Sequence, residues 1–158
     1  MPVVDLTDLP ENPPGGSALL GLDLGEKTIG VAVSDPARII ASPLALIRRS
    51  KFTTDAEALF ALAESRHAGA FVIGLPVSMS GEEGRRCQSV RAFGRNLLRL
   101  RDLPIAFFDE RLSTAAVERV LAEADASRAR RAQLVDKLAA AWILQGALER
   151  LRAAGGAA

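Results

Sequence analysis

The pattern of apolar residues changes once along the chain, and this change limits the possible fold more than any other feature. Residues 17–47 hold three short apolar runs, separated by the turn-forming segments Gly25-Glu26-Lys27 and Asp35-Pro36-Ala37-Arg38. Short apolar runs between such turns are typical of a meander of three antiparallel strands. After Lys51, apolar runs of strand length alternate with segments of helical periodicity. The chain therefore begins as a β-meander and continues as β-α units.

The later segments can be assigned by their spacing. It predicts helices over residues 53–67, 84–100, 114–124 and 133–151, and strands over residues 70–76 and 104–110. The order β-β-β-α-β-α-β-α-α gives an α/β fold with a mixed five-stranded sheet and helices on both faces. This order matches the RNase H-like fold.

The two ends differ from the middle of the chain. Residues 1–16 hold four of the eight prolines and end in two glycines, so we expect a disordered or loosely docked N-terminal tail. Residues 153–158 are expected to form a frayed C-terminus. Residues 17–152 are then a single domain, long enough to bury its own core.

Composition excludes several classes of protein. No apolar run approaches the roughly 20 residues of a membrane span, and the N-terminus lacks the pattern of a signal peptide. The only cysteine, Cys87, excludes an internal disulfide and fits a reducing cytoplasm. With one histidine and one cysteine, a zinc site is not expected, so any metal should be a hard cation held by oxygen.

Three acidic positions do not fit a solvated surface. In LLGLDLG, strand alternation places Asp23 on the face opposite Leu20, Leu22 and Leu24. A buried carboxylate needs a partner, and the flanking glycines leave room for one. Capping of the strand end or of the following turn is the alternative for Asp23.

On its side of the last predicted helix, Asp136 is followed by small or apolar residues. Ala139, Ala140 and Ile143 follow it at i+3, i+4 and i+7, which indicates close packing. The alternative for Asp136 is an inward salt bridge to an arginine or lysine.

Asp109 and Glu110 end the strand PIAFFDE. Adjacent strand residues point to opposite faces, so only one of the two is expected to reach a shared site, and Glu110 could instead pair with Arg111.

These carboxylates could converge beside the sheet. Their mutual repulsion would raise their pKa values unless a cation bound, and Mg²⁺ or Mn²⁺ prefers oxygen ligands. Such a site can hydrolyse phosphodiester bonds without a protein nucleophile.

Several motifs in order resemble the YqgF/RuvX family between Leu19 and Leu151. They are Gly21–Gly25 with Lys27, Ile29–Asp35, Gly74-Leu75-Pro76, Gly81 with Glu83-Gly84, Asp109–Thr114 and Val135–Ala140. The resemblance implies an RNase H-like, RuvC-related nuclease that matures the 5′ end of pre-16S rRNA, or resolves Holliday junctions in branched DNA. It also implies that Asp23, Glu110 and Asp136 are catalytic and bind Mg²⁺ or Mn²⁺.

The chain departs from its relatives in two places: residues 77–80 lack the polar Asn and Asp common there, and the other departure concerns the ligand set. Related resolvases carry an acid at the end of the fourth strand, where this chain has Gly74-Leu75-Pro76. Asp109 therefore stays open as a substitute for Glu110 in the ligand set.

Basic residues near the acids suggest a nucleic-acid partner. Residues 1–16 hold three acids and no Lys or Arg, so the rest of the chain carries a net charge of +4. The candidates for binding phosphates are Lys27, Arg111, Arg128, Arg130, Arg131 and Lys137. Arg91, Arg95 and Arg99 form a stripe on one helix that is more typical of a solvated surface. With few aromatic residues, recognition by backbone shape and charge is favoured over base stacking.

Two rival functions and the oligomeric state stay open at this stage. An actin-like ATP-binding kinase would use the turn after the first strand for phosphate, but it needs two such lobes. A non-catalytic RNA-binding or ribosome-associated module would be expected to lose the acids. We expect a cytoplasmic monomer or homodimer without a membrane partner.

Overall fold

A computed structural model of the chain describes residues 3–11, 15–78, 80–112 and 128–156, with only the backbone given for residues 128–137 and 155–156. The strands are β1 (Val3–Val4), β2 (Ala18–Leu24), β3 (Thr28–Ser34), β4 (Ala41–Arg48), β5 (Ala68–Leu75) and β6 (Ile105–Asp109). The α-helices are α1 (Phe52–Ser65), α2 (Arg85–Leu100) and α4 (Arg128–Gly156). Two short 3-10 helices are η1 (Leu6–Asp8) and η2 (Glu110–Leu112).

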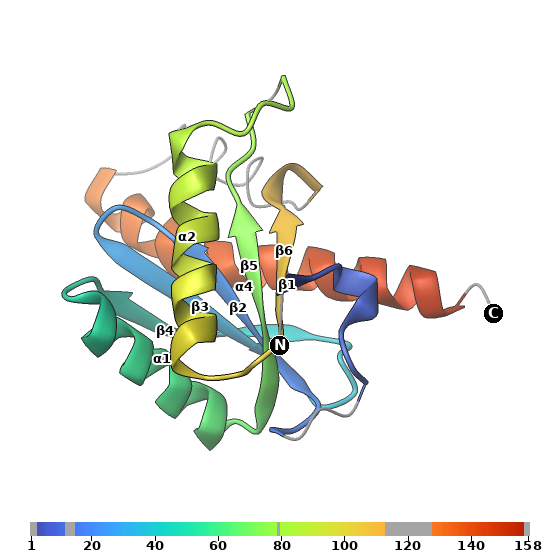
Figure 1. Ribbon diagram of the computed structural model, residues 1–158. Coiled ribbons are helices and arrows are strands. Elements are labelled where there is room, and N and C mark those ends of the chain that lie inside the picture. Colours follow the sequence, from blue (N-terminus) through green and yellow to red (C-terminus); the bar gives the residue numbers. More distant parts are fainter. Residues whose placement is uncertain (1–2, 12–14, 79, 113–127, 157–158) are drawn as a thin grey trace.

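The strands form one mixed sheet in the order β1-β6-β5-β2-β3-β4 (Figure 1). The predicted meander is present, because β2, β3 and β4 pair antiparallel in sequence order. Strands β5 and β6 add to the other side of β2, and both run parallel to it. The carboxyl ends of β2, β5 and β6 therefore lie at one edge of the sheet.

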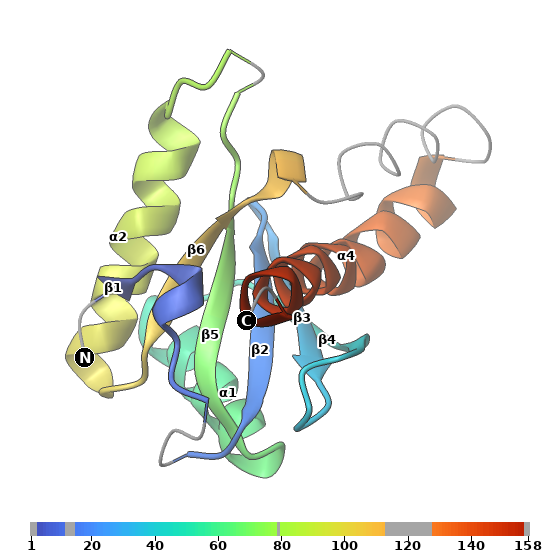
Figure 2. The same ribbon diagram turned by 90° about the vertical axis from the view of Figure 1, so that its right-hand side faces the viewer.

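Helices cover both faces of the sheet, as predicted (Figure 2). Helices α1 and α2 pack on one face, around a core that includes Leu20, Leu22, Leu59 and Phe93. Helix α4 and η1 pack on the other face, around Leu19, Phe108, Ile143 and Leu144. Leu20 and Leu22 belong to the first core and Leu19 to the second, which is the alternation that the sequence predicts for β2.

The sheet has six strands in place of the five predicted, and the extra one comes from the N-terminal segment. Val3 and Val4 pair in parallel with Ile105 and Ala106 of β6. Leu6 and Leu9 are buried in the α4-side core. The sequence did not predict this sixth strand, because a strand of two residues leaves no periodic pattern.

Arg38 ties the same N-terminal segment to the body of the protein. It has a positive φ of 59°. Its guanidinium donates hydrogen bonds to the carbonyl oxygens of Ser17 (2.8 Å) and Pro10 (2.6 Å).

The structure differs from one further prediction and does not describe the residues of another. Helix α4 begins at Arg128, five residues before the predicted start, so Arg128, Arg130 and Arg131 belong to the helix. The helix predicted over residues 114–124 lies outside the described residues. Within the described ranges, no helix is long and apolar enough to cross a membrane.

Helix α4 approaches β2 most closely at Gly21. A Cβ atom built on Gly21 would lie 2.7 Å from Leu144 Cβ and 3.2 Å from the Ala140 carbonyl oxygen. Atoms that close cannot coexist with an added methyl group, so the helix can lie against this strand only because residue 21 has no side chain.

Gly21→Ala should force α4 away from β2. We expect a loss of about 1–3 kcal/mol in the free energy of unfolding, the usual cost of overpacking a dense core. Gly84→Ala is the matched control, because its added methyl group would meet no atom within 4 Å. It should lose less than about 1 kcal/mol, the scale of an N-cap preference. Denaturant unfolding of both variants measures the difference, and equal losses would contradict this packing.

Candidate active site

Asp23 lies near the carboxyl end of β2, on the face that α4 covers. Gly21, two residues before it, contacts Ala140 and Leu144 of that helix, and alternation places Asp23 on the same side. Asp23 is half-buried, whereas Leu22 and Leu24 beside it are buried in the opposite core. The prediction that Leu22 and Leu24 share one face is confirmed, and alternation then places Asp23 on the other.

Glu110 reaches the same face from the end of the neighbouring strands. A Cβ atom built on Gly74 of β5 would lie 2.8 Å from Ile143 Cδ1 and 3.2 Å from Glu110 Oε2. The carboxylate thus occupies space on the α4 side that a side chain at residue 74 would restrict. Leu22 pairs with Ile73, so the residues that follow this pair, Asp23 and Gly74, lie at adjacent strand ends. The structure therefore brings Asp23 and Glu110 to one region.

Asp109, the last residue of β6, is bound to Arg111. Its carboxylate accepts hydrogen bonds from the Arg111 backbone N–H at 3.0 Å and from Nη2 at 2.6 Å. The Arg111 guanidinium, through its hydrogen bonds, is the main cause that lowers the pKa of Asp109 below its usual value. The same ion pair raises the pKa of Arg111. The alternative drawn from the sequence was a pair of Glu110 with Arg111. In the structure, Arg111 pairs with Asp109, the residue before Glu110.

The side chains of Asp136, Lys137, Arg128, Arg130 and Arg131 lie outside the described residues. The backbone of Asp136 is in α4, one helical turn before Ala140. Ala139, Ala140 and Ile143, which share its side of the helix, are fully buried. Among the side chains that the structure describes, no group of three or more His, Cys, Asp or Glu could hold a metal ion.

The other predicted basic residues lie at the same edge of the sheet. Lys27 is exposed in the turn between β2 and β3. Arg111 is exposed in η2, and its Nη1 would lie 3.8 Å from a Cβ built on Gly81. It therefore adjoins the loop that connects β5 to α2.

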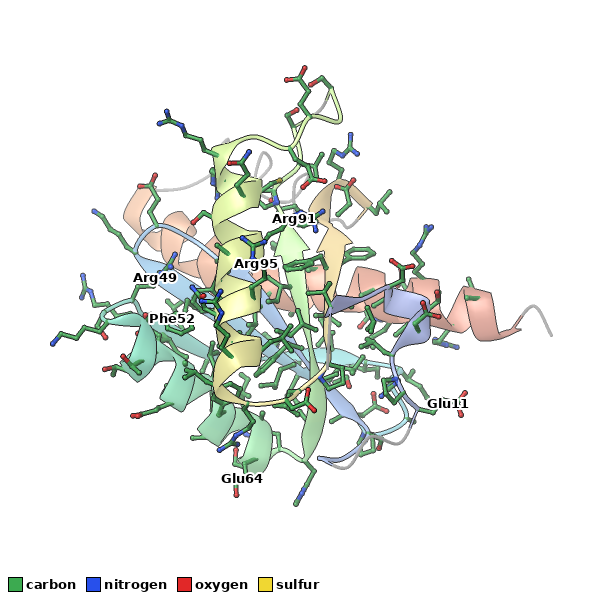
Figure 3. All side chains as sticks on the ribbon, in the orientation of Figure 1. Glu11, Arg49, Phe52, Glu64, Arg91 and Arg95 are labelled. Carbon is green, nitrogen blue, oxygen red and sulfur yellow. The ribbon has the colours of Figure 1, made fainter. Side chains whose placement is uncertain are left out.

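The arginines of the stripe on α2 differ in their contacts; Figure 3 labels Arg91 and Arg95. Arg91 pairs with Glu83 at 2.6 Å, and its guanidinium carbon lies 5.1 Å from the centroid of the Phe107 ring. Arg95 and Arg99 are exposed, as expected of a solvated helix surface. Cys87 is buried on the same helix, and burial raises the pKa of its thiol, which fits an unreactive cysteine.

The family model described as RuvX, Holliday junction resolvase, matches residues 17–150. The chain belongs to the RuvX family. The resemblance inferred from its motifs is confirmed, and the match spans the whole region from β2 into α4.

Curated relatives agree with this membership of the RuvX family. A protein of Phenylobacterium zucineum named "Putative pre-16S rRNA nuclease" is 71% identical over 154 residues, which cover 96% of this chain and 99% of that protein. A protein of Caulobacter vibrioides with the same name is 66% identical over 154 residues, which cover 96% of this chain and 99% of that protein.

Solved structures show the fold of this RuvX chain. Thermus thermophilus RuvC in complex with a Holliday junction substrate matches with a TM-score of 0.52 and 13% identity, over 88% of this chain and 96% of that one. The structure of Thermus thermophilus RuvC in a second solved form has a TM-score of 0.51. The predicted RNase H-like fold is therefore confirmed.

Two features of this region were not found from the sequence. Gly74 was noted only as the place of a missing acid, and its role in making room for Glu110 depends on a contact between two strands. Arg49, which follows β4, was not singled out, because nothing in the sequence indicates that it meets α2.

The ion pair of Asp109 and Arg111 should make stability depend on pH. Because the folded protein lowers the pKa of Asp109, the pair stabilises above the unfolded value of about 3.8–3.9, and this contribution is lost as pH falls through the folded value. The difference in unfolding free energy between the parent and Asp109→Asn should therefore be present at pH 7 and shrink below pH ~4. Glu64→Gln, an exposed change on α1, is the control. A difference that stays constant down to pH ~2 would contradict the pairing.

Proposed function

We propose that the chain is a metal-dependent endonuclease that hydrolyses phosphodiester bonds and processes the 5′ end of pre-16S rRNA. The observation that carries the proposal is the position of the Glu110 carboxylate, in the space left by Gly74 and on the same face as Asp23. The names of the similar proteins supply the substrate class. Acting on precursor rRNA, the protein would work in the cytoplasm, with residues 17–152 as its nuclease domain.

The residues present fit a hard divalent cation. Asp23 and Glu110 are half-buried and supply carboxylate oxygens, the donors that such a cation prefers. We propose Mg²⁺ or Mn²⁺, held by Asp23 and Glu110 and, from α4, by Asp136. The chemistry that such ions supply is activation of a water molecule and stabilisation of the leaving oxygen.

The glycine at residue 74 leaves room for a carboxylate from a neighbouring strand. Where related resolvases carry a carboxylate at the end of the fourth strand, this chain leaves the space open, and Glu110 enters it from the end of β6. We propose that Glu110 replaces that acid and that Asp109 is a positioning residue. Its bond to Arg111 fixes the first residues after β6, from which Glu110 projects.

The basic residues would hold the substrate backbone over these acids. We propose that Lys27, Arg111, Arg128, Arg130, Arg131 and Lys137 contact phosphates. Arginine forms bidentate bonds with phosphate oxygens, which orients the strand without reading its bases.

A second candidate substrate is branched DNA. The RuvX description names a Holliday junction resolvase, and the solved RuvC complex holds such a junction. Symmetric cleavage of a four-way junction requires a homodimer, whereas cleavage of rRNA by a monomer does not.

The proposal predicts unequal effects of three acid-to-amide variants. With Mg²⁺ or Mn²⁺ and labelled pre-16S rRNA or four-way junction, Asp23→Asn and Glu110→Gln should slow cleavage by at least about 100-fold, because each removes a charged ligand. Asp109→Asn is the matched neighbour and should lose less than about 10-fold, the low end for an indirect positioning effect.

The outcomes separate the alternatives. Loss of cleavage in Asp109→Asn with retention in Glu110→Gln would show that Asp109 is the ligand. No cleavage of either substrate by the parent protein would favour a non-catalytic RNA-binding module.

Gly74→Ala tests the space that Glu110 uses. The added methyl group would lie 3.2 Å from Glu110 Oε2, so the carboxylate must shift. We expect a loss of about 10-fold in cleavage rate, as for other small displacements of a ligand. Its melting temperature should stay above that of Gly21→Ala, because the nearer contact at residue 74 is the flexible end of Ile143. Unchanged cleavage would argue against a role for Glu110.

A further inference from the structure

A small hollow lies on the α2 side of the sheet, behind the strand that carries Asp23. Its volume is about 90 Å³, and its lining includes Gly25, Glu26, Arg49, Arg86 and Ser89. These residues come from three places: the turn after β2, the residue after β4, and the first two turns of α2. Two arginines, a serine and one glutamate therefore line the same hollow.

Arg49 is held in place by groups that do not cancel its charge. Its Nη1 donates a hydrogen bond of 2.7 Å to the carbonyl oxygen of Gly25. Its guanidinium carbon lies 5.6 Å from the centroid of the Phe93 ring on α2. Phe52 contacts the same ring edge-on at 5.2 Å, and Figure 3 shows Arg49 and Phe52 beside α2. An arginine fixed in this way loses little side-chain entropy when it binds an anion.

The surroundings of the hollow are basic. Lys27, Arg48, Lys51 and Arg85 each lie within two residues of a lining residue in the chain, and all four are exposed. Glu26 is also exposed at this turn and reduces the positive charge, but the arginines and lysines outnumber it. A net positive hollow of this kind attracts a phosphate group.

The hollow and the candidate active site lie on opposite faces of one strand end. Leu24 lines the hollow, and Asp23 beside it faces α4. The turn Gly25–Lys27 follows directly and lies at the edge of the sheet. A polynucleotide that crosses this edge would pass from the acids, over Lys27, to Arg49 and Arg86.

We propose that Arg49, Arg86 and Ser89 bind a backbone phosphate of the substrate strand, at a point separate from the cleavage site. This inference rests on the proposed function, since it assigns a second contact to the same polynucleotide. The guanidinium groups of Arg49 and Arg86 bind the phosphate oxygens, and the Ser89 hydroxyl donates a further hydrogen bond. RNA and DNA share this phosphodiester chemistry, so the contact anchors either substrate without reading its sequence.

Binding without cleavage tests this contact. Fluorescence anisotropy in EDTA, over a series of KCl concentrations, would measure the affinity for a labelled pre-16S rRNA fragment and for a four-way DNA junction. Arg86→Gln and the double variant Arg49→Gln/Arg86→Gln remove the proposed contact. Arg66→Gln/Arg152→Gln is the matched control, because both arginines are exposed and lie at the opposite end of the sheet.

The double variant should bind roughly 5- to 20-fold more weakly at low salt, with a shallower dependence of affinity on salt, because fewer counterions are released. Arg86→Gln should show part of this loss with an unchanged circular dichroism spectrum, since Arg86 is exposed. The control should change affinity by less than about 3-fold, the effect of a distant screened charge.

Equal affinity and equal salt dependence in the parent and the double variant would overturn this inference and leave the proposed function untouched. A control variant that loses as much affinity as the double variant would overturn it as well. Failure of the parent protein to bind either nucleic acid would overturn the proposed function itself. Loss on only one of the two nucleic acids would identify the strand that this contact holds.

Discussion

The close approach of α4 to β2 is the constraint on which the rest of the structure depends. At Gly21 the strand has no side chain, and Leu144 and Ala140 of the helix fill the space. This contact fixes the helix over the carboxyl ends of β2 and β5, where Ile143 covers Gly74. Gly21 lets α4 pack closely on β2, and Gly74 leaves room for Ile143 and Glu110. These two glycines therefore determine how the helix lies over the strand ends.

At the same edge of the sheet, strand alternation places charged residues on both faces. Leu24 lines the hollow beside α2 together with Arg49 and Arg86, whereas alternation places Asp23 on the α4 face. Asp109 and Glu110 also differ in their contacts, since Arg111 binds Asp109 whereas Glu110 Oε2 lies near Gly74.

The sequence predicted the features that arise from local periodicity. The alternation of LLGLDL indicated the faces of Leu20, Leu22 and Asp23, and the three apolar runs indicated the meander of β2, β3 and β4. It did not predict β1, because the pairing of Val3 and Val4 with β6 depends on a distant strand. Two further features likewise depend on residues far apart in the chain. Glu110 lies in the space beside Gly74, and Arg49 and Arg86 line the same hollow.

The central claim is that Asp23 and Glu110 hold a divalent cation on the α4 face of the sheet. The most direct measurement is an anomalous difference map from crystals of this protein soaked in Mn²⁺, recorded at a wavelength where manganese scatters anomalously. We predict a peak between the carboxylates of Asp23 and Glu110, with Asp109 still bound to Arg111. A peak on Asp109 with none at Glu110, or none beside Asp23 at saturating Mn²⁺, would contradict this claim.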